Sequence, residues 1–486
     1  MNWIAVYPEM FLLVMASVVM LVDVFVNDPE HRAAYGLSVL ALVVLVVLGS
    51  MFYLQDGRLL AMQRMVSYDP MSNLLKMFAA LATLGALVYG RRYALDRGMW
   101  GGELFSLALF SLLGQFIMIS ANNLLMVYLG LELMSLSLYA LVALRRDSAL
   151  ATEAAMKYFV LGALASGFLL YGMSLVYGAT GSLDLSVIYH AAAFEPIDRA
   201  VLVMGVVFLV AGVAFKFGAA PFHMWIPDVY QGAPTVVVLL VAAAPKLAAF
   251  AMAMRLLVLG MFPLAVDWQQ MVMLLAIASL VVGNLAAIAQ TNLKRMLAYS
   301  TIAQIGFVLL GLMSGMVHGN GMSSSQAYGA TMFYLLVYVL STLGTFGIVM
   351  FLAHEGFEAE ELADFAGLGK THPWLAGIMT FLMFSLAGIP PFAGFYAKFV
   401  VLQSLLATGR IWLVVVAVLL SVIGAFYYLR LVKIMYFDAP TREHKVRASG
   451  SAWALMSVNG LAVLLLGIVP GGLMTLCYQA ITNTLR

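Results

Sequence analysis

The hydrophobic residues of this chain fall into long runs that polar clusters, glycines and prolines separate. Fourteen such runs follow one another, and each is about as long as a bilayer-crossing helix, which needs roughly 20 mainly apolar residues. We predict spans at 3–26, 33–54, 72–90, 103–120, 122–144, 152–178, 198–219, 235–258, 268–290, 296–316, 327–353, 373–406, 409–437 and 452–480. The pattern therefore predicts an all-α polytopic membrane protein, with about 14 transmembrane helices in a single membrane domain over residues 1–486.

The composition agrees with this fold class. Hydrophobic residues make up 64% of the 486 positions and charged residues only 10%, whereas soluble proteins average about 45–50% and about 25%. The first run follows no positively charged stretch and ends without a small-residue cleavage site, so we expect a retained helix and not a signal peptide.

The charge pattern indicates a membrane partner and an orientation. The net charge is only +2 and no basic tract is long enough for nucleic acid, so the lipid bilayer is the expected partner. One side of the predicted bundle holds Arg32, Arg91, Arg92, Arg97, Arg145, Arg146, Lys294, Arg295, Lys370, Arg430, Lys433, Arg442, Lys445 and Arg447, and the other holds Arg58, Arg64, Arg199, Arg255, Arg410 and Arg486. Because cytoplasmic loops carry the Lys/Arg excess, we expect both termini on the outer side.

Redox chemistry has little support in this chain. Its single cysteine, Cys477, cannot form an intrachain disulfide, a zinc site or an iron–sulfur cluster. We interpret Cys477 as a small apolar residue of the last helix. Any redox centre is therefore expected on another chain.

A weak internal repeat divides the chain. The pattern G-x-x-P-F occurs at 218–222 and at 388–392, an offset of 170, and Asn-Leu occurs at 123–124 and at 292–293, an offset of 169. Two units of five spans would explain both offsets, and because five is odd the second unit would be inverted, as in transporters with broken helices. We predict an N-terminal three-helix segment at 1–100, a first repeat at 101–258, an inverted second repeat at 268–437 and a C-terminal helix at 452–486.

Four charged residues lie in the middle of predicted spans or beside their breaks: Glu132, Lys216, Lys246 and Lys398. A charge at the centre of a spanning helix costs roughly 2.5–3.5 kcal/mol, so such residues face the bundle interior and usually mark a proton or ion path. Burial favours the neutral form of each group, whereas a Glu/Lys contact favours the charged forms, so moving the partner switches a lysine between holding and releasing a proton. A fixed ion pair or snorkelling is the alternative, and we prefer snorkelling for Lys76.

Prolines break two spans beside these lysines. Pro221 removes the hydrogen-bond partner of the Phe217 carbonyl, and the prolines at 390–391 do the same for the carbonyls at 386–387. A carbonyl freed within the membrane must be buried in protein or hydrated, so the breaks predict internal water beside the lysines. His223 lies just past the first break, where an imidazole is either a proton relay or an ordinary core residue.

The chain resembles the antiporter-like subunits of respiratory complex I, the proton-translocating NADH:quinone oxidoreductase. The segments that carry the resemblance are KFGAAPFHMWIPDVYQGAPT at 216–235, YLGLELMSLSLYAL at 128–141, QTNLKRMLAYSTIAQIG at 290–306 and SLAGIPPFAGFYAKF at 385–399. The resemblance extends over essentially the whole chain. Among the three paralogues it is most similar to the N type, because no long lateral helix follows the last span and position 398 is lysine, where the M type has glutamate.

The resemblance implies roles for the matching residues. Glu132 and Lys216 look like the paired acid and base of a first half-channel. Lys246 looks like a central relay, with His223 nearby, and Lys398 looks like the terminal lysine of a second half-channel.

The resemblance also implies partners and cofactors. Lys157 matches the KY pair of the sixth helix and is expected to modulate Lys216. The chain is expected to translocate protons in a bacterial inner membrane, with other membrane subunits of the complex, including paralogous antiporter-like ones, and internal water as partners. FMN, iron–sulfur clusters and quinone are expected on other subunits. A subunit of a multi-subunit cation/proton antiporter, or a membrane scaffold whose buried charges only fix packing, are the alternatives.

Overall fold

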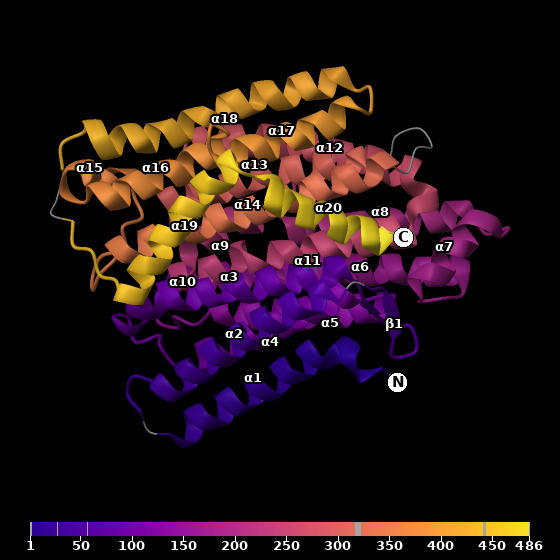
Figure 1. Ribbon diagram of the computed structural model, residues 1–486, viewed down its shortest axis with the longest axis horizontal. Coiled ribbons are helices and arrows are strands. Elements are labelled where there is room, and N and C mark those ends of the chain that lie inside the picture. Colours follow the sequence, from indigo (N-terminus) through magenta and orange to yellow (C-terminus); the bar gives the residue numbers. More distant parts are fainter. Residues whose placement is uncertain (1, 27, 56, 316–321, 441–443, 486) are drawn as a thin grey trace.

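The computed structural model describes residues 2–26, 28–55, 57–315, 322–440 and 444–485 as a bundle whose helices run side by side along its length (Figure 1). Arg442 and Arg486, two of the basic residues behind the predicted orientation, lie outside these ranges. The helices of the first half are α1 (Tyr7–Phe25), α2 (Arg32–Leu54), α3 (Pro70–Leu95), α4 (Gly102–Ser120), α5 (Leu124–Val142), α6 (Ala149–Thr180), α7 (Leu185–Phe194), α8 (Arg199–Phe217), α9 (Trp225–Gly232), α10 (Thr235–Ala242) and α11 (Ala244–Ala253).

The second half continues the same plan. Its helices are α12 (Ala265–Ile288), α13 (Leu293–Ser314), α14 (Met322–Leu352), α15 (Leu368–Thr371), α16 (Pro373–Ala387), α17 (Ala393–Leu406), α18 (Ile411–Phe437), α19 (Gly450–Ile468) and α20 (Gly471–Leu485). The remaining elements are three short 3-10 helices (Trp3–Val6, Phe262–Leu264 and Leu362–Phe365), a π-helix η2 (Met254–Gly260) and a hairpin of β1 (Leu59–Ala61) and β2 (Val66–Tyr68).

The predicted all-α membrane fold is confirmed. Among the described residues, 13 helical segments are long and apolar enough to cross a membrane. The remaining predicted span, 373–406, is divided into α16 and α17. At about 1.5 Å per residue each half is too short to cross the roughly 30 Å hydrocarbon core alone, so together they form one broken crossing. The short helix α7, the hairpin and the division of the last span at Pro470 were not predicted.

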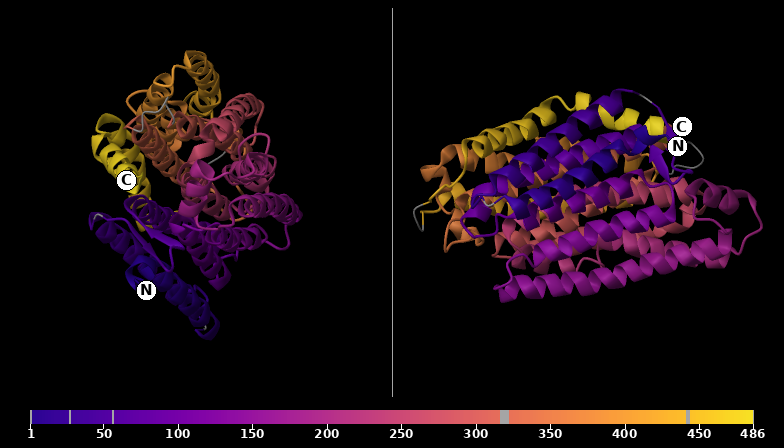
Figure 2. Two further views of the ribbon diagram at one scale, coloured as in Figure 1. Left: turned by 90° about the vertical axis from the view of Figure 1, so that its right-hand side faces the viewer. Right: turned by 90° about the horizontal axis from the view of Figure 1, so that it is seen from below.

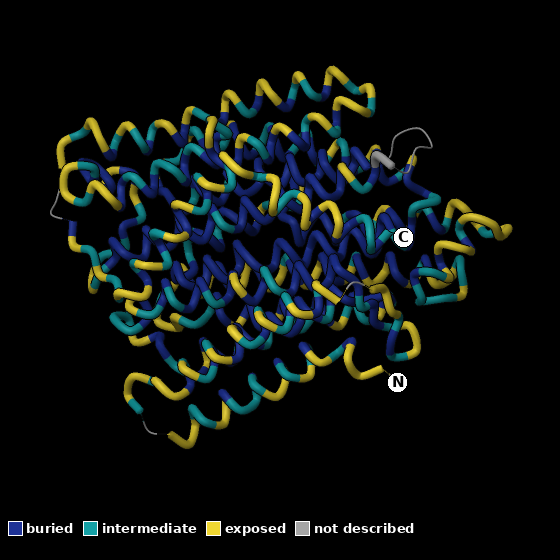
Figure 3. The backbone as a smooth tube through the Cα atoms, in the orientation of Figure 1, coloured by how far each residue is buried: buried dark blue, intermediate teal, exposed yellow. Residues whose placement is uncertain are grey.

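The burial pattern separates central from peripheral helices (Figure 3). The segment from α10 through η2 is buried along its whole apolar window, whereas α1, α2, α18 and α19 are mostly accessible. Their accessible side chains are apolar, for example Val14, Val422 and Val458. Seen from the end, α1 and α18 lie on opposite sides of the bundle (Figure 2). Apolar surface on both flanks is what a bilayer requires.

Equivalent helix contacts recur in the two halves. A Cβ added to Gly114 on α4 would lie 2.3 Å from the Met134 nitrogen on α5, and one added to Gly283 on α12 would lie 2.5 Å from the Ala303 nitrogen on α13. Both residues of the second pair lie 169 positions after those of the first, the offset already present in the sequence. α4 is the fourth crossing and α12 the ninth, so the two pairs run in opposite directions, as an inverted repeat requires. The residue limits of the repeats and of the flanking segments remain a prediction.

Candidate functional site

The first halves of both broken spans end at a glycine with a left-handed backbone. Gly218 follows α8 with φ +75°, and Gly388 follows α16 with φ +85°. This conformation costs other L-residues roughly 1–2 kcal/mol. At Gly218 a Cβ would also lie 1.8 Å from the Cδ1 atom of Ile226. Glycine at each position allows the chain to leave the helix sharply, before the proline.

Lys246 lies against the first break. It belongs to α11 and is only 1% exposed. Its Nζ donates hydrogen bonds to the carbonyl oxygens of Phe217 at 2.9 Å and Lys216 at 3.3 Å. These are the last two carbonyls of α8, and Phe217 is the one that Pro221 deprives of its helical partner.

Lys398 lies in the same way against the second break. It is on α17 and is 8% exposed. Its Nζ donates to the carbonyl oxygens of Leu386 at 3.0 Å and Ala387 at 2.9 Å, and to the hydroxyl of Ser421 on α18 at 3.0 Å. The Leu386 carbonyl also accepts from Gln304 Nε2 at 3.0 Å.

The lysines themselves therefore supply the donors that the breaks require. The sequence predicts internal water beside the lysines, and in the structure the two lysine Nζ atoms donate to the freed carbonyls. A charge-assisted hydrogen bond is stronger than a neutral one and fixes the position of the cation. The break in the helix and the buried charge stabilise each other.

The described hydrogen bond of the Lys216 side chain goes to a hydroxyl, and its pairing with Glu132 stays a prediction. Its Nζ donates to the hydroxyl of Ser135 on α5 at 2.7 Å, and no ion pair joins Lys216 to Glu132 within the described ranges. Glu132 lies one turn before Ser135 on the same helix, and its Oε1 is buried without a hydrogen-bond partner. The structure thus brings the acid and the base to one helix face, with Ser135 as the direct contact of the lysine.

Lys157 lies at the surface of the bundle. Its side chain is 45% exposed and its Nζ contacts Glu153 Oε1 and Asp228 Oδ2, both at 2.8 Å. The other carboxylate oxygen of Asp228 accepts from Arg295 at 2.9 Å. Its ion pair with Asp228 therefore connects Lys157 to α9, the second half of the first broken span, and its effect on Lys216 stays a prediction.

His223 is not joined to the lysines by a described hydrogen bond. It lies in the loop between α8 and α9, half-buried, and its Nδ1 is buried without a hydrogen-bond partner. Its backbone carbonyl accepts from the Ile226 nitrogen at 2.9 Å. The loop holds the ring at the break, against the Pro221 backbone.

A network of hydroxyl and amide groups surrounds the second break. Gln304 on α13 donates to the Tyr428 hydroxyl at 2.9 Å and accepts from the Tyr334 hydroxyl, and Ser300 shares a 2.5 Å hydrogen bond with Tyr428. A cavity of about 10 Å³ lies between this network and Lys398, which is about the space one water molecule needs. Sequence reasoning missed these residues, although Ser300 and Gln304 share one face of α13 at the spacing i, i+4.

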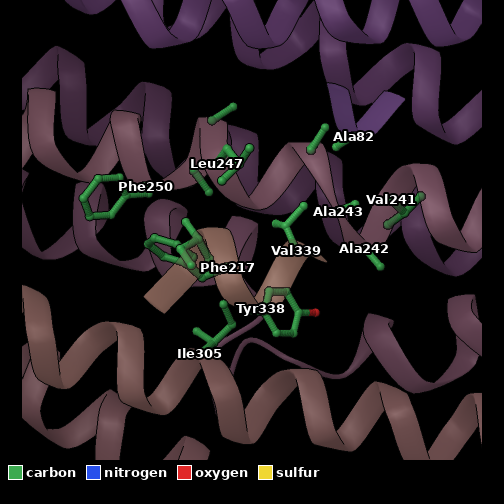
Figure 4. Close-up of a cluster of buried hydrophobic side chains, with 14 of the residues drawn as sticks. Ala82, Phe217, Val241, Ala242, Ala243, Leu247, Phe250, Ile305, Tyr338 and Val339 are labelled. Carbon is green, nitrogen blue, oxygen red and sulfur yellow. The ribbon is translucent and has the colours of Figure 1, made fainter. Parts of the chain in front are cut away.

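An apolar layer lies beside the first break (Figure 4). Phe217, Leu247 and Phe250 from the first half pack with Ile305 and Val339 from the second. All five side chains are buried. This layer contrasts with the polar surroundings of Lys398.

Two further charged residues differ from their predicted places. Lys76 does not snorkel: it is 4% exposed and contacts Glu9 Oε1 on α1 at 2.5 Å. Arg255 is not in an outer loop, because η2 turns it inward to a fully buried ion pair with Asp69 Oδ2 at 2.5 Å. In both cases the partner is a carboxylate from a distant helix end, which the local sequence does not reveal. Thr484 of the last helix also donates to Asp69.

These features define a class: a polytopic membrane protein of antiporter-like fold, with buried lysines at two broken helices. Residues 121–424 match the NADH:quinone oxidoreductase/Mrp antiporter transmembrane family. The chain is 56% identical to NADH-quinone oxidoreductase subunit N of Polaromonas naphthalenivorans, over 99% of this chain and 98% of that protein. The chain therefore belongs to the family of NADH-quinone oxidoreductase N subunits.

Solved structures support the same fold. A chain of respiratory complex I from Thermus thermophilus matches with a TM-score of 0.81 and 32% identity, over 96% of this chain and 98% of that one. A chain of the Mrp complex from Dietzia sp. DQ12-45-1b matches with a TM-score of 0.86 but 19% identity, over 99% and 98%. The second likeness shows a shared fold only.

Proposed function

We propose that this N-type subunit moves protons across the membrane through Lys216, Lys246 and Lys398, with Glu132 as the acid that acts on the first of them. One observation carries the proposal most: two buried lysines donate to carbonyls opened by helix breaks. Such a site holds a charge in place without a carboxylate, so the charge is not trapped in a fixed ion pair. That distinguishes a relay from a packing device such as Arg255 with Asp69.

The hydrogen-bond partners of Lys398 allow the lysine to release its proton and stay in place. An ammonium group has three N–H donors, and Lys398 uses three, to Leu386, Ala387 and Ser421. Loss of a proton removes one donor and creates a lone pair. The Ser421 hydroxyl can rotate and donate to that lone pair, while both carbonyls keep a donor. The neutral amine therefore remains satisfied in the same place.

Transfer between the halves requires a change in the apolar layer. Lys246 donates to the Phe217 carbonyl. The side chains of Phe217, Leu247 and Phe250 are apolar, and the polar group drawn in this cluster is the Tyr338 hydroxyl (Figure 4). We propose that a proton passes only when water enters this layer, and that a shift of Glu132 relative to Lys216 controls that step. One carboxylate oxygen of Glu132 is buried without a described hydrogen-bond partner, which supports a carboxyl group that can change both its protonation state and its position.

Lys157 and His223 have secondary roles in the proposal. Lys157 acts on Lys216 indirectly, since it is tied to Asp228 on the half-helix that follows the first break. His223 is placed in the loop of the break, where a rotated ring could pass a proton to water.

The redox chemistry is proposed to lie on other subunits. With one cysteine the chain cannot hold an iron–sulfur cluster by itself. FMN, the clusters and the quinone site would lie elsewhere in the complex, beside paralogous antiporter-like subunits. The complex would sit in a bacterial inner membrane with both termini of this chain on the periplasmic side, as the Lys/Arg distribution predicts.

A cation/proton antiporter subunit is the second candidate, because the Mrp chain shares the fold. Sequence identity favours the first candidate, because the chain is 56% identical to an N subunit and 19% identical to the Mrp chain. The experiment is the replacement Lys216→Ala in the whole complex, with proton uptake measured in inverted membrane vesicles supplied with NADH. We expect an assembled complex with lost pumping, while the exposed-loop control Lys445→Ala pumps normally. Normal pumping by Lys216→Ala would refute the relay, and sodium-driven proton exchange without NADH oxidation would favour the antiporter.

A further inference from the structure

A basic cavity opens at one end of the bundle. It has a volume of about 660 Å³ and lies between the end of α3 and the start of α19. Its charged lining residues are Arg91, Arg92, Asp96, Arg447 and Glu30. Three arginines against two carboxylates leave an excess positive charge. The predicted orientation places this end at the cytoplasmic surface.

The arginines are held with donors to spare. Asp96 accepts from Arg92 Nε at 3.2 Å with one oxygen and from Arg447 Nη1 at 3.2 Å with the other. The Arg91 guanidinium lies over the Tyr35 ring, 5.0 Å from its centre. A guanidinium has five N–H donors, so each arginine keeps several for a ligand. Asp96 thus positions two cations and cannot neutralise both.

An apolar groove begins where the basic cavity ends. It has a volume of about 590 Å³ and lies between α2, α3, α14 and α19. In Figure 1, α19 lies beside α3 and α14 on the side facing the viewer. Its lining is almost wholly aliphatic and aromatic, and on α3 it extends from Phe78 to Tyr89. The next turn of α3 carries Arg91 and Arg92, and on α19 the lining passes from Ser449 of the cavity to Ser451 of the groove.

The dimensions match one leaflet of a membrane. Phe78 to Tyr89 spans about 17 Å at 1.5 Å per residue, and half of a hydrocarbon core of roughly 30 Å is about 15 Å. The basic cavity then lies at the level where phosphate groups are found. A polar end and an apolar slot of this length fit one amphiphile that lies along the membrane normal.

We infer that this site, the cavity of Arg91, Arg92 and Arg447 with the groove below it, binds one anionic phospholipid. Its phosphates would accept from the arginines, and its acyl chains would fill the groove between α3 and α19. Basic pockets between transmembrane helices at the cytoplasmic side take such head groups. The lipid would join the N-terminal three-helix segment to the C-terminal helices, and it would not take part in proton transfer.

The test uses photoreactive phosphatidylglycerol on the purified membrane complex, with the labelled peptides identified by mass spectrometry. We expect adducts within 78–96 and 446–466. Labelling with photoreactive phosphatidylcholine should be lower by about tenfold, because its choline cation offsets the phosphate charge that attracts the arginines. The double variant Arg92→Gln/Arg447→Gln should lose labelling by a similar factor. The control Arg146→Gln, an exposed arginine at the same end but outside the cavity lining, should label as wild type.

A second variant removes the acyl site without touching the arginines. Val458→Trp on α19 fills the groove and should abolish labelling, whereas Val422→Trp on α18, at a valine of similar exposure away from the groove, should not. Absence of adducts in the wild-type complex, for example because another subunit covers the groove, would overturn the inference. Equal labelling by phosphatidylcholine would overturn the requirement for an anionic head group, and unchanged labelling in Val458→Trp would show that the groove is not the site.

Discussion

At each of the two broken helices a lysine donates to the freed backbone carbonyls, but the two lysines come from different positions relative to the break. After the second break, position 398 carries the lysine that binds the freed carbonyls of the same broken span. The position 170 residues earlier, in the first half, is Asp228. Asp228 turns to the surface and binds Lys157 and Arg295. There the freed carbonyls are bound instead by Lys246, from the next crossing.

The difference shows what the repeat preserves. It preserves a glycine, a proline and a buried cation at the open carbonyls, and not the sequence position of that cation. In the second half the lysine holds the two parts of one span together, whereas in the first half it holds α8 to α11. A proton change at Lys398 would therefore act on the two parts of one broken span and on Ser421 of α18. A change at Lys246 would act between α8 and α11.

The largest effects are expected from removing either lysine. Lys246→Met and Lys398→Met should each lower NADH-driven pumping at least tenfold, since a proton-transfer group typically contributes about 10²–10⁴-fold. The two variants should differ in the thermal stability of the complex. Lys246→Met removes the donor from both the Lys216 and the Phe217 carbonyls. Lys398→Met removes it from the Ala387 carbonyl, while Gln304 still donates to the Leu386 carbonyl.

Each orphaned buried carbonyl costs about 1–3 kcal/mol. We therefore expect the complex with Lys246→Met to melt at the lower temperature of the two, as measured by thermal unfolding in detergent. Equal melting temperatures would show that the backbone contacts of the two lysines are energetically alike. Lys445→Ala, in an exposed loop, serves as the control for both.

The glycines before the two breaks should give the next largest effect. Gly218→Ala and Gly388→Ala each force a left-handed alanine, which costs about 1–2 kcal/mol. At Gly388 the nearest neighbour of the new Cβ is the Lys398 side chain, 2.9 Å away, whereas at Gly218 it is Ile226. We expect both variants to lose stability and Gly388→Ala to lose more pumping.

The matched control is Gly377→Ala on α16, where nothing lies within 4 Å of the added carbon. That variant should be neutral or slightly stabilising, because glycine weakens a helix interior. If Gly218→Ala lost pumping as strongly as Gly388→Ala at equal stability, the proposed difference between the two breaks would be wrong.

Loss of a hydroxyl partner should lower pumping less than loss of the lysine itself. Ser135→Ala and Ser421→Ala each remove one acceptor from a buried ammonium, worth about 1.5–3 kcal/mol. We expect Ser421→Ala to impair pumping more, because Lys216 has Glu132 one turn away to replace its lost partner. The ratio of protons pumped to NADH oxidised measures this. Ser137→Ala on α5 is the control, because the described hydrogen bond of its hydroxyl goes to the Leu133 carbonyl of the same helix. A reversed order of the two variants would contradict the proposal.

The sequence predicts those features that have a local cause. Proline and glycine mark the breaks because their backbone chemistry acts at their own positions. A lysine within an apolar run is recognisable because its burial is costly wherever it points. The spans, the two breaks and the buried lysines were therefore predictable.

The contacts between helices were not predictable, because they depend on helix rotation. Serine is common in spanning helices, so nothing in the sequence distinguishes Ser135 or Ser421 from the others. Lys76 and Arg255 were misplaced for the same reason, since their carboxylate partners Glu9 and Asp69 come from other helix ends. A single sequence fixes neither the rotation of a helix nor its neighbour.

The smallest effect is expected from Lys157→Ala. Its ion pairs with Glu153 and Asp228 are partly exposed, and such pairs contribute about 0–1 kcal/mol. Asp228 would keep its contact with Arg295, so α9 should stay in place and pumping should fall by less than about twofold, within that energy range. Pumping and thermal unfolding of Lys157→Ala should be compared with those of Arg199→Ala, which also makes an exposed ion pair but on the other side of the bundle. A loss of pumping as large as that of Lys246→Met, with unchanged stability, would contradict this expectation. It would mean that the charge at Lys157 acts on Lys216 over a distance, so that proton transfer at the first break depends on a surface ion pair and proton transfer at the second break does not.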